Sequence, residues 1–362
     1  YKSDVYQFCC TNPLRVIQER ISNKLREINA NKLPKIVQVI HNFNARAGTE
    51  LHTRNINDGL HSRFQSTVLF PGSLPTAWID LAESQTNRHL RVLTLRKESI
   101  AANDSFLGLY GDLTNAHVES VFSNFLSGGD YPIVHFQHLA GWNSLVLPII
   151  AKAHGCSVVI SLHDYYLLCP EYNLVLPDLQ RCGKPMADGE DPDCLYCLGT
   201  KRLYHGTSKP LLLRDYLIQR KQLVKRIFEA ADVLVSPSRF VRDRFVSAYG
   251  HVIKCKIRTV PHGIEVTDKI TRPKLGDLLK VGFLGNAYDR KGIYVFLQTA
   301  ARLKGKSVQF EIFGGVPSSL AKVVNDLGII QHGYYNRKDL PRLLSKIHLV
   351  LIPSIWDETF CM

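Results

Sequence analysis

From Pro34 onward, short apolar runs alternate with longer amphipathic segments. Runs such as KIVQVI at 35–40, YPIVHF at 131–136 and SVVISL at 157–162 are rich in Val and Ile and show almost no polar alternation. Strands of this composition are covered on both faces, which is typical of a parallel sheet whose strands are joined by helices. The pattern therefore predicts a doubly wound α/β fold.

The alternation occurs in two blocks, and 362 residues exceed what one hydrophobic core usually spans. Residues 266–279 combine charges with Pro and Gly, a composition typical of a linker. We therefore expect two tandem Rossmann-like domains, over 33–265 and 280–362. The second has only about four expected strands, so we expect it to be incomplete. Apolar residues spaced three and four apart predict a leading helix or linker within 1–32.

Charge and hydropathy restrict the partners and the location. The formal charge of +13 favours anionic partners, or it simply keeps the protein soluble. No zinc-finger spacing, RNP motif or basic repeat is present, so we expect no nucleic-acid partner. No apolar run approaches the roughly 18 residues that cross a bilayer. We therefore expect a cytoplasmic protein.

One basic segment could still contact a membrane. Residues 201–226 hold eight Lys or Arg and one Asp among many leucines. Such a segment can dock peripherally on the anionic inner face of the plasma membrane, where lipid-linked acceptors reside. Alternatively, it is a packed crossover helix with a solvated cationic face.

Loops that follow strands carry the candidate site residues, because ligands bind at the carboxyl edge of an open parallel sheet. Gly48 precedes a helix whose backbone N–H groups could meet an anion, or it simply makes the turn. His163 ends a strand, where an imidazole can donate to a substrate oxygen or move a proton, and Asp164 could orient it. A structural role for His163 is the alternative.

The second domain carries a candidate diphosphate cradle. A loop with Gly285 and Asn286 leads to Arg290 and Lys291 at the start of a helix. Backbone amides and a lysine at a helix start favour a diphosphate, although a solvated cationic loop has the same composition. Farther along the chain, Glu358 follows the apolar run LVLIP in a loop of aromatic and small residues.

The order of these motifs carries a family resemblance. The stretches are NARAGTELHTRNINDGL, IVHFQHLAGWNSLVLP, VVISLHDYYLLCP, ADVLVSPSRFVRDRF, RTVPHGIEV, VGFLGNAYDRKGIYVFLQTAARL, FEIFGG and PSIWDETF. Over about 330 residues their order and spacing resemble those of the family 4 retaining glycosyltransferases of the GT-B fold. The resemblance implies two Rossmann-like domains, with the donor bound mainly by the C-terminal domain, the acceptor by the N-terminal domain, and reaction in the cleft between them.

The resemblance also implies a reaction. The enzyme would move a sugar, with retention, from a UDP- or GDP-sugar to a saccharide or lipid-linked glycan acceptor in polysaccharide or glycolipid biosynthesis. Because the leaving diphosphate is already a good leaving group, catalysis needs charge stabilisation and positioning more than a strong nucleophile. No cofactor is then required for catalysis. A noncatalytic glycan-binding or scaffold module of the same fold is the alternative.

Roles carry over residue by residue as implications of the resemblance. Gly48 would meet the donor diphosphate, Lys291 would neutralise it, and His163 would contact the donor sugar. Glu358 matches the first acid of the family's E-x7-E motif and would bind donor sugar hydroxyls. Further donor-side positions are Gly285, Asn286, Arg290, Phe360 and Cys361, and the acceptor-side positions are His135, His138 and Asp164.

The sequence departs from the family pattern at three places. Asn286 stands where many members have an arginine. Lys291, helped by Arg290, would therefore supply more of the positive charge that neutralises the diphosphate. Cys361 stands where glycine is usual, and its side chain leaves less room for a ligand to approach the backbone. The second glutamate of the motif would lie four residues past Met362, so we expect an incomplete donor site.

A cysteine-containing insertion occupies 169–209 of the first domain. Cys169, Cys182, Cys194 and Cys197 have the spacing C-x12-C-x11-C-x2-C in a Pro- and Gly-rich loop. The closing C-x2-C pair favours a structural zinc site that braces a loop near the acceptor side. Disulfides and buried free thiols are the alternatives.

Overall fold

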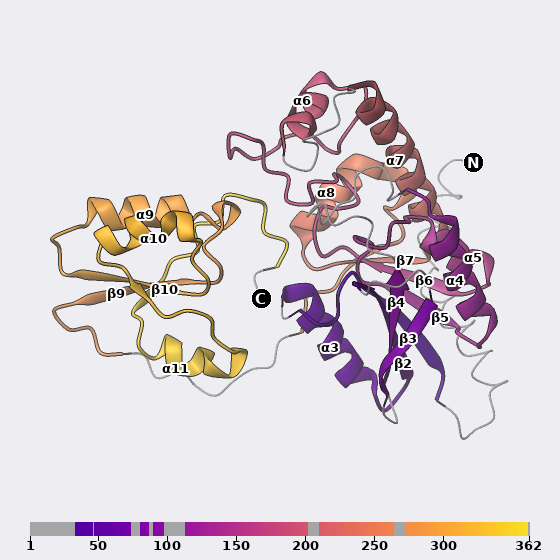
Figure 1. Ribbon diagram of the computed structural model, residues 1–362, viewed down its shortest axis with the longest axis horizontal. Helices are drawn as coiled ribbons and strands as arrows, with labels where there is room; N and C mark the ends of the chain where they lie inside the picture. The colour runs from indigo at the N-terminus through magenta and orange to yellow at the C-terminus, as the bar shows by residue number, and fades with distance from the viewer. Residues whose placement is uncertain are drawn as a thin grey trace. The chain divides into compact units, whose positions relative to one another are not determined.

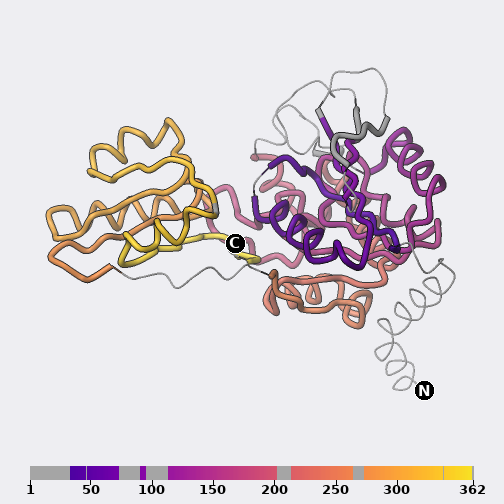
Figure 2. Tube along the Cα trace, turned by 90° about the horizontal axis from the view of Figure 1, so that it is seen from below, coloured from indigo at the N-terminus to yellow at the C-terminus, as the bar shows by residue number. Residues whose placement is uncertain are grey.

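The computed structural model describes residues 33–45, 47–73, 80–86, 90–97, 113–201, 210–263 and 273–360 (Figure 2). The predicted leading helix within 1–32 lies outside these ranges. The chain divides into two compact units, and each is described by itself. Unit 1 comprises residues 1–172, 184–263 and 359–362, and unit 2 comprises residues 173–183 and 264–358.

Unit 1 is built on an eight-stranded sheet with strand order β3-β4-β2-β1-β5-β6-β7-β8. Neighbouring strands run parallel, except that β3 at one edge is antiparallel to β4. Four of the five β1 residues and all four β5 residues are buried, as expected for strands covered on both faces. The strands are β1 (Lys35–Val39), β2 (Gln65–Ser73), β3 (Asp80–Thr86), β4 (Leu90–Lys97), β5 (Ile133–Phe136), β6 (Ser157–Ser161), β7 (Val233–Ser236) and β8 (Ile257–Thr259).

Helices join most of these strands, and polar caps determine where several of them begin. Asn115 accepts the N–H of Val118 at 3.1 Å, and Ser238 accepts the N–H of Val241 at 3.2 Å, so each satisfies a backbone donor of a first helical turn. Figure 1 shows α4 and α5 packed beside each other. The helices are α3 (Gly48–Leu60), α4 (Ala116–Ser127), α5 (Leu147–Ala153), α6 (Pro192–Thr200), α7 (Pro210–Ala230), α8 (Arg239–Tyr249) and the 3-10 turn η2 (Gly250–Val252).

Unit 2 has a four-stranded parallel sheet with strand order β11-β10-β9-β12. Helices α9 and α10 lie over one face of it and α11 over the other (Figure 1). Phe283, Phe296 and Phe310 pack edge to face at its centre, with ring centroids 5.3 Å apart in each contact. The elements are β9 (Leu279–Leu284), η3 (Asp289–Lys291), α9 (Ile293–Arg302), β10 (Val308–Phe313), α10 (Ser318–Asp326), β11 (Ile330–Gln331), η4 (Arg337–Asp339), α11 (Leu340–Leu344) and β12 (Leu349–Val350).

The predicted α/β alternation is present in both units, including the four strands expected in the second. Two strands and one α-helix were not predicted. β3 has the largely polar sequence DLAESQT, which gives no apolar run. β8 is only three residues long and leads into a segment rich in breakers. α6 lies inside the cysteine insertion, where the Asp191 carboxylate caps a helix that starts with Pro192.

Candidate functional site

Lys291 and Glu358, both predicted as site residues, form an ion pair in unit 2. Lys291 lies in η3 after β9, and Glu358 lies in the loop after β12. Nζ of Lys291 is 2.7 Å from Oε1 of Glu358, and the Ser354 hydroxyl donates to the same oxygen at 2.7 Å. Burial raises the pKa of Glu358, but the hydrogen bonds from Lys291 and Ser354 outweigh it, so the pKa is lower than usual. The carboxylate is therefore ionised at neutral pH.

Two glycine-containing loops, after β9 and β10, lie against each other in unit 2. Gly314 has a φ of +142°, and a Cβ there would overlap the carbonyl oxygen of Gly285. Oδ1 of Asn286 accepts the N–H of Gly315 at 3.0 Å. Asn286, predicted as a donor-side residue that replaces an arginine, thus joins the two loops through its side chain.

The backbone of η3 holds the loop that carries Glu358. The carbonyl oxygen of Arg290 accepts the N–H of Ile355 at 3.1 Å, and its guanidinium lies 5.0 Å from the centroid of the Tyr288 ring. Gly292, with a φ of +78°, approaches Pro353 so closely that a Cβ would overlap the Pro353 carbonyl oxygen. These contacts fix the cation-bearing turn and the acid-bearing loop against each other.

In unit 1, His163 at the end of β6 belongs to a buried polar chain. Its Nε2 is 2.8 Å from Oε1 of Gln137, whose amide nitrogen donates to Oε1 of Gln38 at 2.8 Å. The same nitrogen is 3.2 Å from Nδ1 of His135, and Nε2 of His135 is 2.9 Å from the Ser161 hydroxyl. Because Oε1 of Gln137 accepts, Nε2 of His163 donates and Nδ1 carries the lone pair of the neutral ring.

Burial keeps both of these histidines neutral. It lowers the pKa of His163 well below its usual range, with help from nearby imidazoles, and lowers the pKa of His135 to about 3. His163 can therefore offer a substrate a hydrogen-bond acceptor, but it carries no charge at pH 7.

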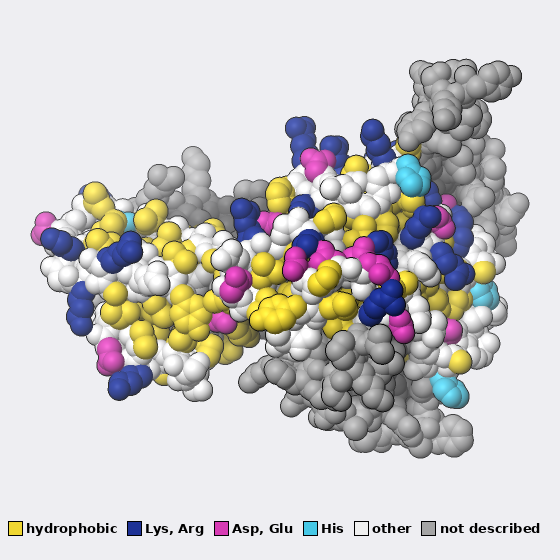
Figure 3. Space-filling view, turned by 90° about the horizontal axis from the view of Figure 1, so that it is seen from above, with side chains coloured by type: hydrophobic (Ala, Val, Ile, Leu, Met, Phe, Trp, Pro, Cys, Tyr) yellow, Lys and Arg dark blue, Asp and Glu magenta, His cyan; other side chains and the backbone are white. Residues whose placement is uncertain are grey.

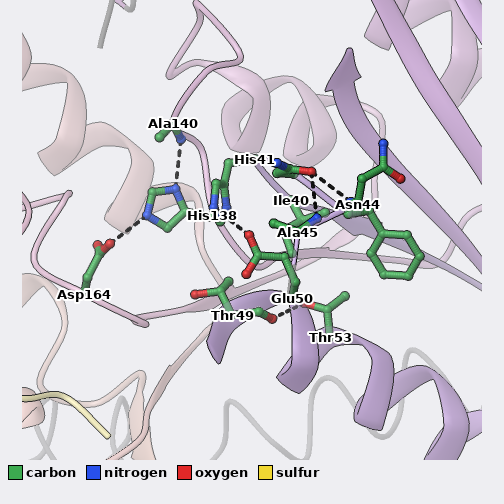
Figure 4. A network of polar contacts seen from close by, with 12 residues as sticks. Ile40, His41, Asn44, Ala45, Thr49, Glu50, Thr53, His138, Ala140 and Asp164 are labelled. Carbon is green, nitrogen blue, oxygen red and sulfur yellow. Dashed lines mark hydrogen bonds and ion pairs between the residues drawn. The ribbon is translucent and has the colours of Figure 1, made fainter. Parts of the chain in front are cut away.

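The prediction that Asp164 orients His163 is corrected by the structure, because the Asp164 carboxylate binds a different histidine. Oδ2 of Asp164 is 3.0 Å from Nε2 of His138, and Oδ1 accepts the N–H of Tyr166 at 2.8 Å. Nδ1 of His138 accepts the N–H of Ala140 at 3.0 Å (Figure 4). The His138 ring is thus held between two partners, with Nδ1 accepting from Ala140 and Nε2 facing the Asp164 carboxylate.

A second histidine–carboxylate pair, His41 with Glu50, was not predicted. Nε2 of His41 is 3.0 Å from Oε1 of Glu50, and the ring centroids of His41 and His138 are 4.6 Å apart (Figure 4). Burial raises the pKa of Glu50, but the hydrogen bond and charge of His41 outweigh it, so the pKa is lower than usual. The available signal was that the two residues lie on either side of Gly48 in the sequence, one just after β1 and one in the first turn of α3.

Gly48 is the first residue of α3, whereas the sequence predicts it just before the helix. The preceding residue, Ala47, makes no side-chain capping bond, and a Cβ on Gly48 would meet nothing within 4 Å. The surrounding residues therefore leave room for a side chain at position 48, so packing alone does not require glycine there. The first amides of a helix lack intrahelical partners and favour an anion.

Two further histidines, His52 and His262, pack with His163 and were also missed. The ring centroids of His52 and His262 are 3.9 Å apart, and each lies 5.0 Å from that of His163. Desolvation lowers the pKa of both His52 and His262 to about 4. The Phe360 ring, predicted on the donor side, packs edge-on against His262 at 4.8 Å. Cys361 lies outside the described residues.

A pocket on unit 1 opens at the carboxyl ends of β5 and β6, where the sequence predicts a ligand site. It brings together His138, His163 and Asp164, but His135 is not among its lining residues. The lining residues are Phe136, Gln137, His138, Leu139, Ile160, Ser161, Leu162, His163, Asp164, Tyr166 and Leu167.

The four cysteines of the predicted zinc site are divided between the two units, and the zinc site stays a prediction. Cys169, Cys194 and Cys197 belong to unit 1 and Cys182 to unit 2. Within the part of the chain that the structure describes, no group of three or more His, Cys, Asp or Glu side chains could hold a metal ion. Cys169 instead packs against apolar residues of α6 and α7, and burial raises the pKa of its thiol to about 12.

The apolar side chains of the basic segment are part of a packed helix. Leu213, Leu217 and Val224 of α7 are buried. Arg214 and Lys221 pair with Glu190 and Asp188 at 2.5 and 2.6 Å, and Figure 3 shows acidic and basic side chains interspersed on this surface. This arrangement matches the second alternative for this segment, a packed crossover helix with a solvated charged face. Contact with a membrane stays a prediction. None of the helices that the structure describes is long and apolar enough to cross a membrane.

Comparison with known proteins relates this arrangement to a large group of enzymes. The family model described as glycosyltransferase family 4 matches residues 46–268, and that described as glycosyl transferases group 1 matches residues 279–362. An uncharacterized 42.6 kDa protein in the cps region of Klebsiella pneumoniae is 23% identical over 251 residues, or 69% of this chain. That match spans 58% of the relative's length.

Solved structures share the fold. Anabaena HepE in complex with UDP-glucose has a TM-score of 0.54 at 14% identity, over 90% of this chain and 76% of that one. The lipopolysaccharide outer core galactosyltransferase WaaB, in its apo form, has a TM-score of 0.50 at 11% identity, over 88% of this chain and 74% of that one. Because the first family match alone covers more than half of the sequence, this protein belongs to glycosyltransferase family 4, with the two Rossmann-like domains of the GT-B fold.

Proposed function

We propose that this protein is a retaining glycosyltransferase that moves a sugar from a nucleotide-diphosphate sugar to a saccharide or lipid-linked glycan acceptor. Family membership supports sugar transfer, and the related fold of HepE was solved with UDP-glucose bound. A UDP-sugar is therefore the first donor to test, followed by a GDP-sugar. We place the reaction in the cytoplasm, in the synthesis of a cell-surface polysaccharide or glycolipid.

The observation that carries the proposal is the pairing of Lys291 with Glu358 in unit 2. A lysine ammonium and a glutamate carboxylate 2.7 Å apart supply the two kinds of group that a nucleotide sugar needs. The ammonium of Lys291 would neutralise the diphosphate as it leaves, and the carboxylate of Glu358 would accept hydrogen bonds from sugar hydroxyls. The loop after β9, which Asn286 joins to the loop after β10, leads into the turn that carries Lys291.

In unit 1, His163 and the pocket at the ends of β5 and β6 would serve the sugar side of the reaction. A neutral imidazole is suited to a transition state in which positive charge develops on the sugar, because a cationic ring there would repel it. The hydrogen bond to Gln137 fixes which nitrogen of His163 carries the proton and which carries the lone pair.

The test is a donor-turnover assay. The protein is incubated with a panel of UDP- and GDP-sugars, and release of the nucleoside diphosphate is measured with and without a saccharide acceptor. We expect slow hydrolysis of one donor and faster release when the acceptor fits. Lys291→Met and Glu358→Gln should each lower this rate by at least about a hundredfold, as loss of an electrostatic catalytic contact typically does. Retention of configuration is then read from the anomeric proton of the product.

Two outcomes would contradict the proposal. If no nucleoside diphosphate binds at millimolar concentration, the donor site is absent. If a donor binds but is neither hydrolysed nor transferred, and glycans bind without turnover, the protein is the noncatalytic module of the same fold.

A further inference from the structure

We propose that the pocket at the ends of β5 and β6 receives a hydroxyl group of an uncharged sugar, and that Asp164 makes this pocket reject sugars that carry a carboxylate. This inference rests on the proposed function and deepens it, because it names the class of saccharide that the site takes. The sugar belongs either to the donor or to the acceptor, and the same hydroxyl chemistry serves both.

The first step is the size of the pocket. All of its described lining residues belong to unit 1, and both His163 and Asp164 are among them. Its cavity volume is about 20 Å³, and about 10–15 Å³ is enough for one water molecule. The pocket therefore has room for about one group of that size, such as a hydroxyl group, rather than for a whole sugar ring.

The second step is the negative charge of the lining. Among the described lining residues, Asp164 is the only carboxylate, and its side chain is 20% exposed, so part of it is open to solvent. Burial raises the pKa of Asp164, but the charge and hydrogen bond of His138 and the N–H of Tyr166 outweigh it, so the pKa is lower than usual. The carboxylate is therefore ionised at neutral pH.

The third step is the positive charge near this carboxylate. None of the described lining residues is Lys or Arg. Arg220 packs over the Tyr166 ring, 4.9 Å from its centroid, and donates to the Tyr166 carbonyl oxygen, but it does not line the pocket. The His163 ring is neutral at pH 7, because burial lowers its pKa well below the usual range. Neither Arg220 nor His163 therefore offers the pocket a charge that would hold an anion.

The fourth step counts hydrogen-bonding groups. Oδ1 of Asp164 accepts the N–H of Tyr166 at 2.8 Å, and Oδ2 is 3.0 Å from Nε2 of His138. Each carboxylate oxygen has two lone pairs, so each can accept one more hydrogen bond. The Nε2–H of His163 is already used, because it donates to Gln137.

These features distinguish two kinds of ligand group. A sugar hydroxyl can donate its proton to a free lone pair of Asp164. A sugar carboxylate has no proton to donate at neutral pH, and it brings a second negative charge beside the first. The pocket therefore favours neutral sugars over uronic acids, and the repulsive group supplies the specificity.

The donor arm of the test measures dissociation constants by isothermal titration calorimetry at pH 7.5. The probes are UDP and two matched pairs, UDP-glucose with UDP-glucuronate and UDP-galactose with UDP-galacturonate. If the donor sugar enters the pocket, the neutral member of at least one pair should bind at least about tenfold more tightly than its acidic partner. UDP gives the affinity that the nucleotide alone provides.

The acceptor arm uses simple glycosides and ligand-observed NMR. The probes are methyl glucoside, methyl glucuronide and the uncharged amide of the glucuronide. The amide has nearly the size of the carboxylate but no charge, so it separates the effect of charge from that of shape. If the acceptor sugar enters the pocket, the glucoside and the amide should bind at least about tenfold more tightly than the glucuronide.

One variant and one control assign the preference to Asp164. Asp164→Asn removes the charge and should bring neutral and acidic sugars to within about threefold of each other. Asp243→Asn, on α8 of the same unit, removes an exposed carboxylate that pairs with Arg242 at 2.8 Å, and it should keep the wild-type preference. If Asp164→Asn does not fold, the comparison of neutral and acidic sugars in the wild type decides.

The possible failures are distinguishable. The proposal is overturned if neither arm shows a tenfold preference in the wild type, or if folded Asp164→Asn keeps the preference unchanged. A protein that nevertheless binds UDP and turns over a UDP-sugar retains its proposed function. A preference among the glycosides in a protein that binds no nucleoside diphosphate overturns the proposed function and supports the pocket. A protein that binds neither UDP nor glycosides contradicts both.

Discussion

Replacing Glu358 with glutamine should tighten the binding of UDP while it removes sugar transfer. In the ligand-free protein the ammonium of Lys291 is held by the Glu358 carboxylate at 2.7 Å. A neutral amide releases this ammonium for the diphosphate. UDP carries no sugar, so it loses nothing when the carboxylate is removed, whereas a UDP-sugar loses its contact with Glu358.

The size of the effect follows from the geometry of the pair. Two unit charges 2.7 Å apart attract by roughly 6 kcal/mol at an effective dielectric constant of about 20, before the cost of desolvation is subtracted. The Lys291 and Glu358 side chains are 32% and 20% exposed, which places the pair between surface pairs and buried ones. We expect a net effect of about 1–2 kcal/mol, which corresponds to roughly 5- to 30-fold tighter UDP binding.

Calorimetric titration of UDP into the wild type and Glu358→Gln measures this directly. Asp357→Asn is the matched control, because it removes the adjacent carboxylate, which pairs with Arg181 at 3.0 Å. The control should leave the affinity within about twofold of the wild type, since Asp357 does not pair with Lys291. An unchanged or weaker affinity for UDP in folded Glu358→Gln would refute the reasoning.

Three further predictions concern stability. The folded-state pKa of Glu358 is lowered, so its contribution to the free energy of unfolding is present above the unfolded pKa of about 4.5 and is lost as the pH falls through the folded value. Urea unfolding of wild type and Glu358→Gln should therefore differ at pH 7 and converge as the pH falls below the folded pKa of Glu358. Gly292→Ala should lower the free energy of unfolding by at least about 2 kcal/mol, because its Cβ would overlap the Pro353 carbonyl, whereas Gly276→Ala should be nearly neutral in thermal denaturation. Gln137→Leu leaves buried polar partners unsatisfied and should cost about 1–3 kcal/mol by urea unfolding.

Much of the fold could be predicted because buried parallel strands leave a strong signal in a sequence. The apolar runs KIVQVI and SVVISL have the composition of strands that are covered on both faces, and they form β1 and β6. The antiparallel edge strand β3 lacked that signal, because its sequence DLAESQT has no apolar run. The split of the cysteine insertion between the two units depends on long-range contacts that no local pattern reports.

Only those site residues that lie in recognisable sequence motifs could be predicted. Lys291 and Glu358 were found through their loops, but their direct pairing was not expected. The partner of Asp164 was predicted wrongly, because neighbours along the chain are not always partners in space. His41 and Glu50 lie nine residues apart, and only the return of α3 toward the end of β1 brings them together.

The side-chain link between Asn286 and Gly315 has a consequence for binding thermodynamics. Two loops that are already joined in the free protein lose their conformational entropy during folding rather than when a ligand arrives. A nucleotide sugar would then bind to loops whose conformation is already fixed, so binding would cost little further conformational entropy. A substitution such as Asn286→Ala would move that entropy loss from the folding step to the binding step, so affinity should fall while the on-rate changes little.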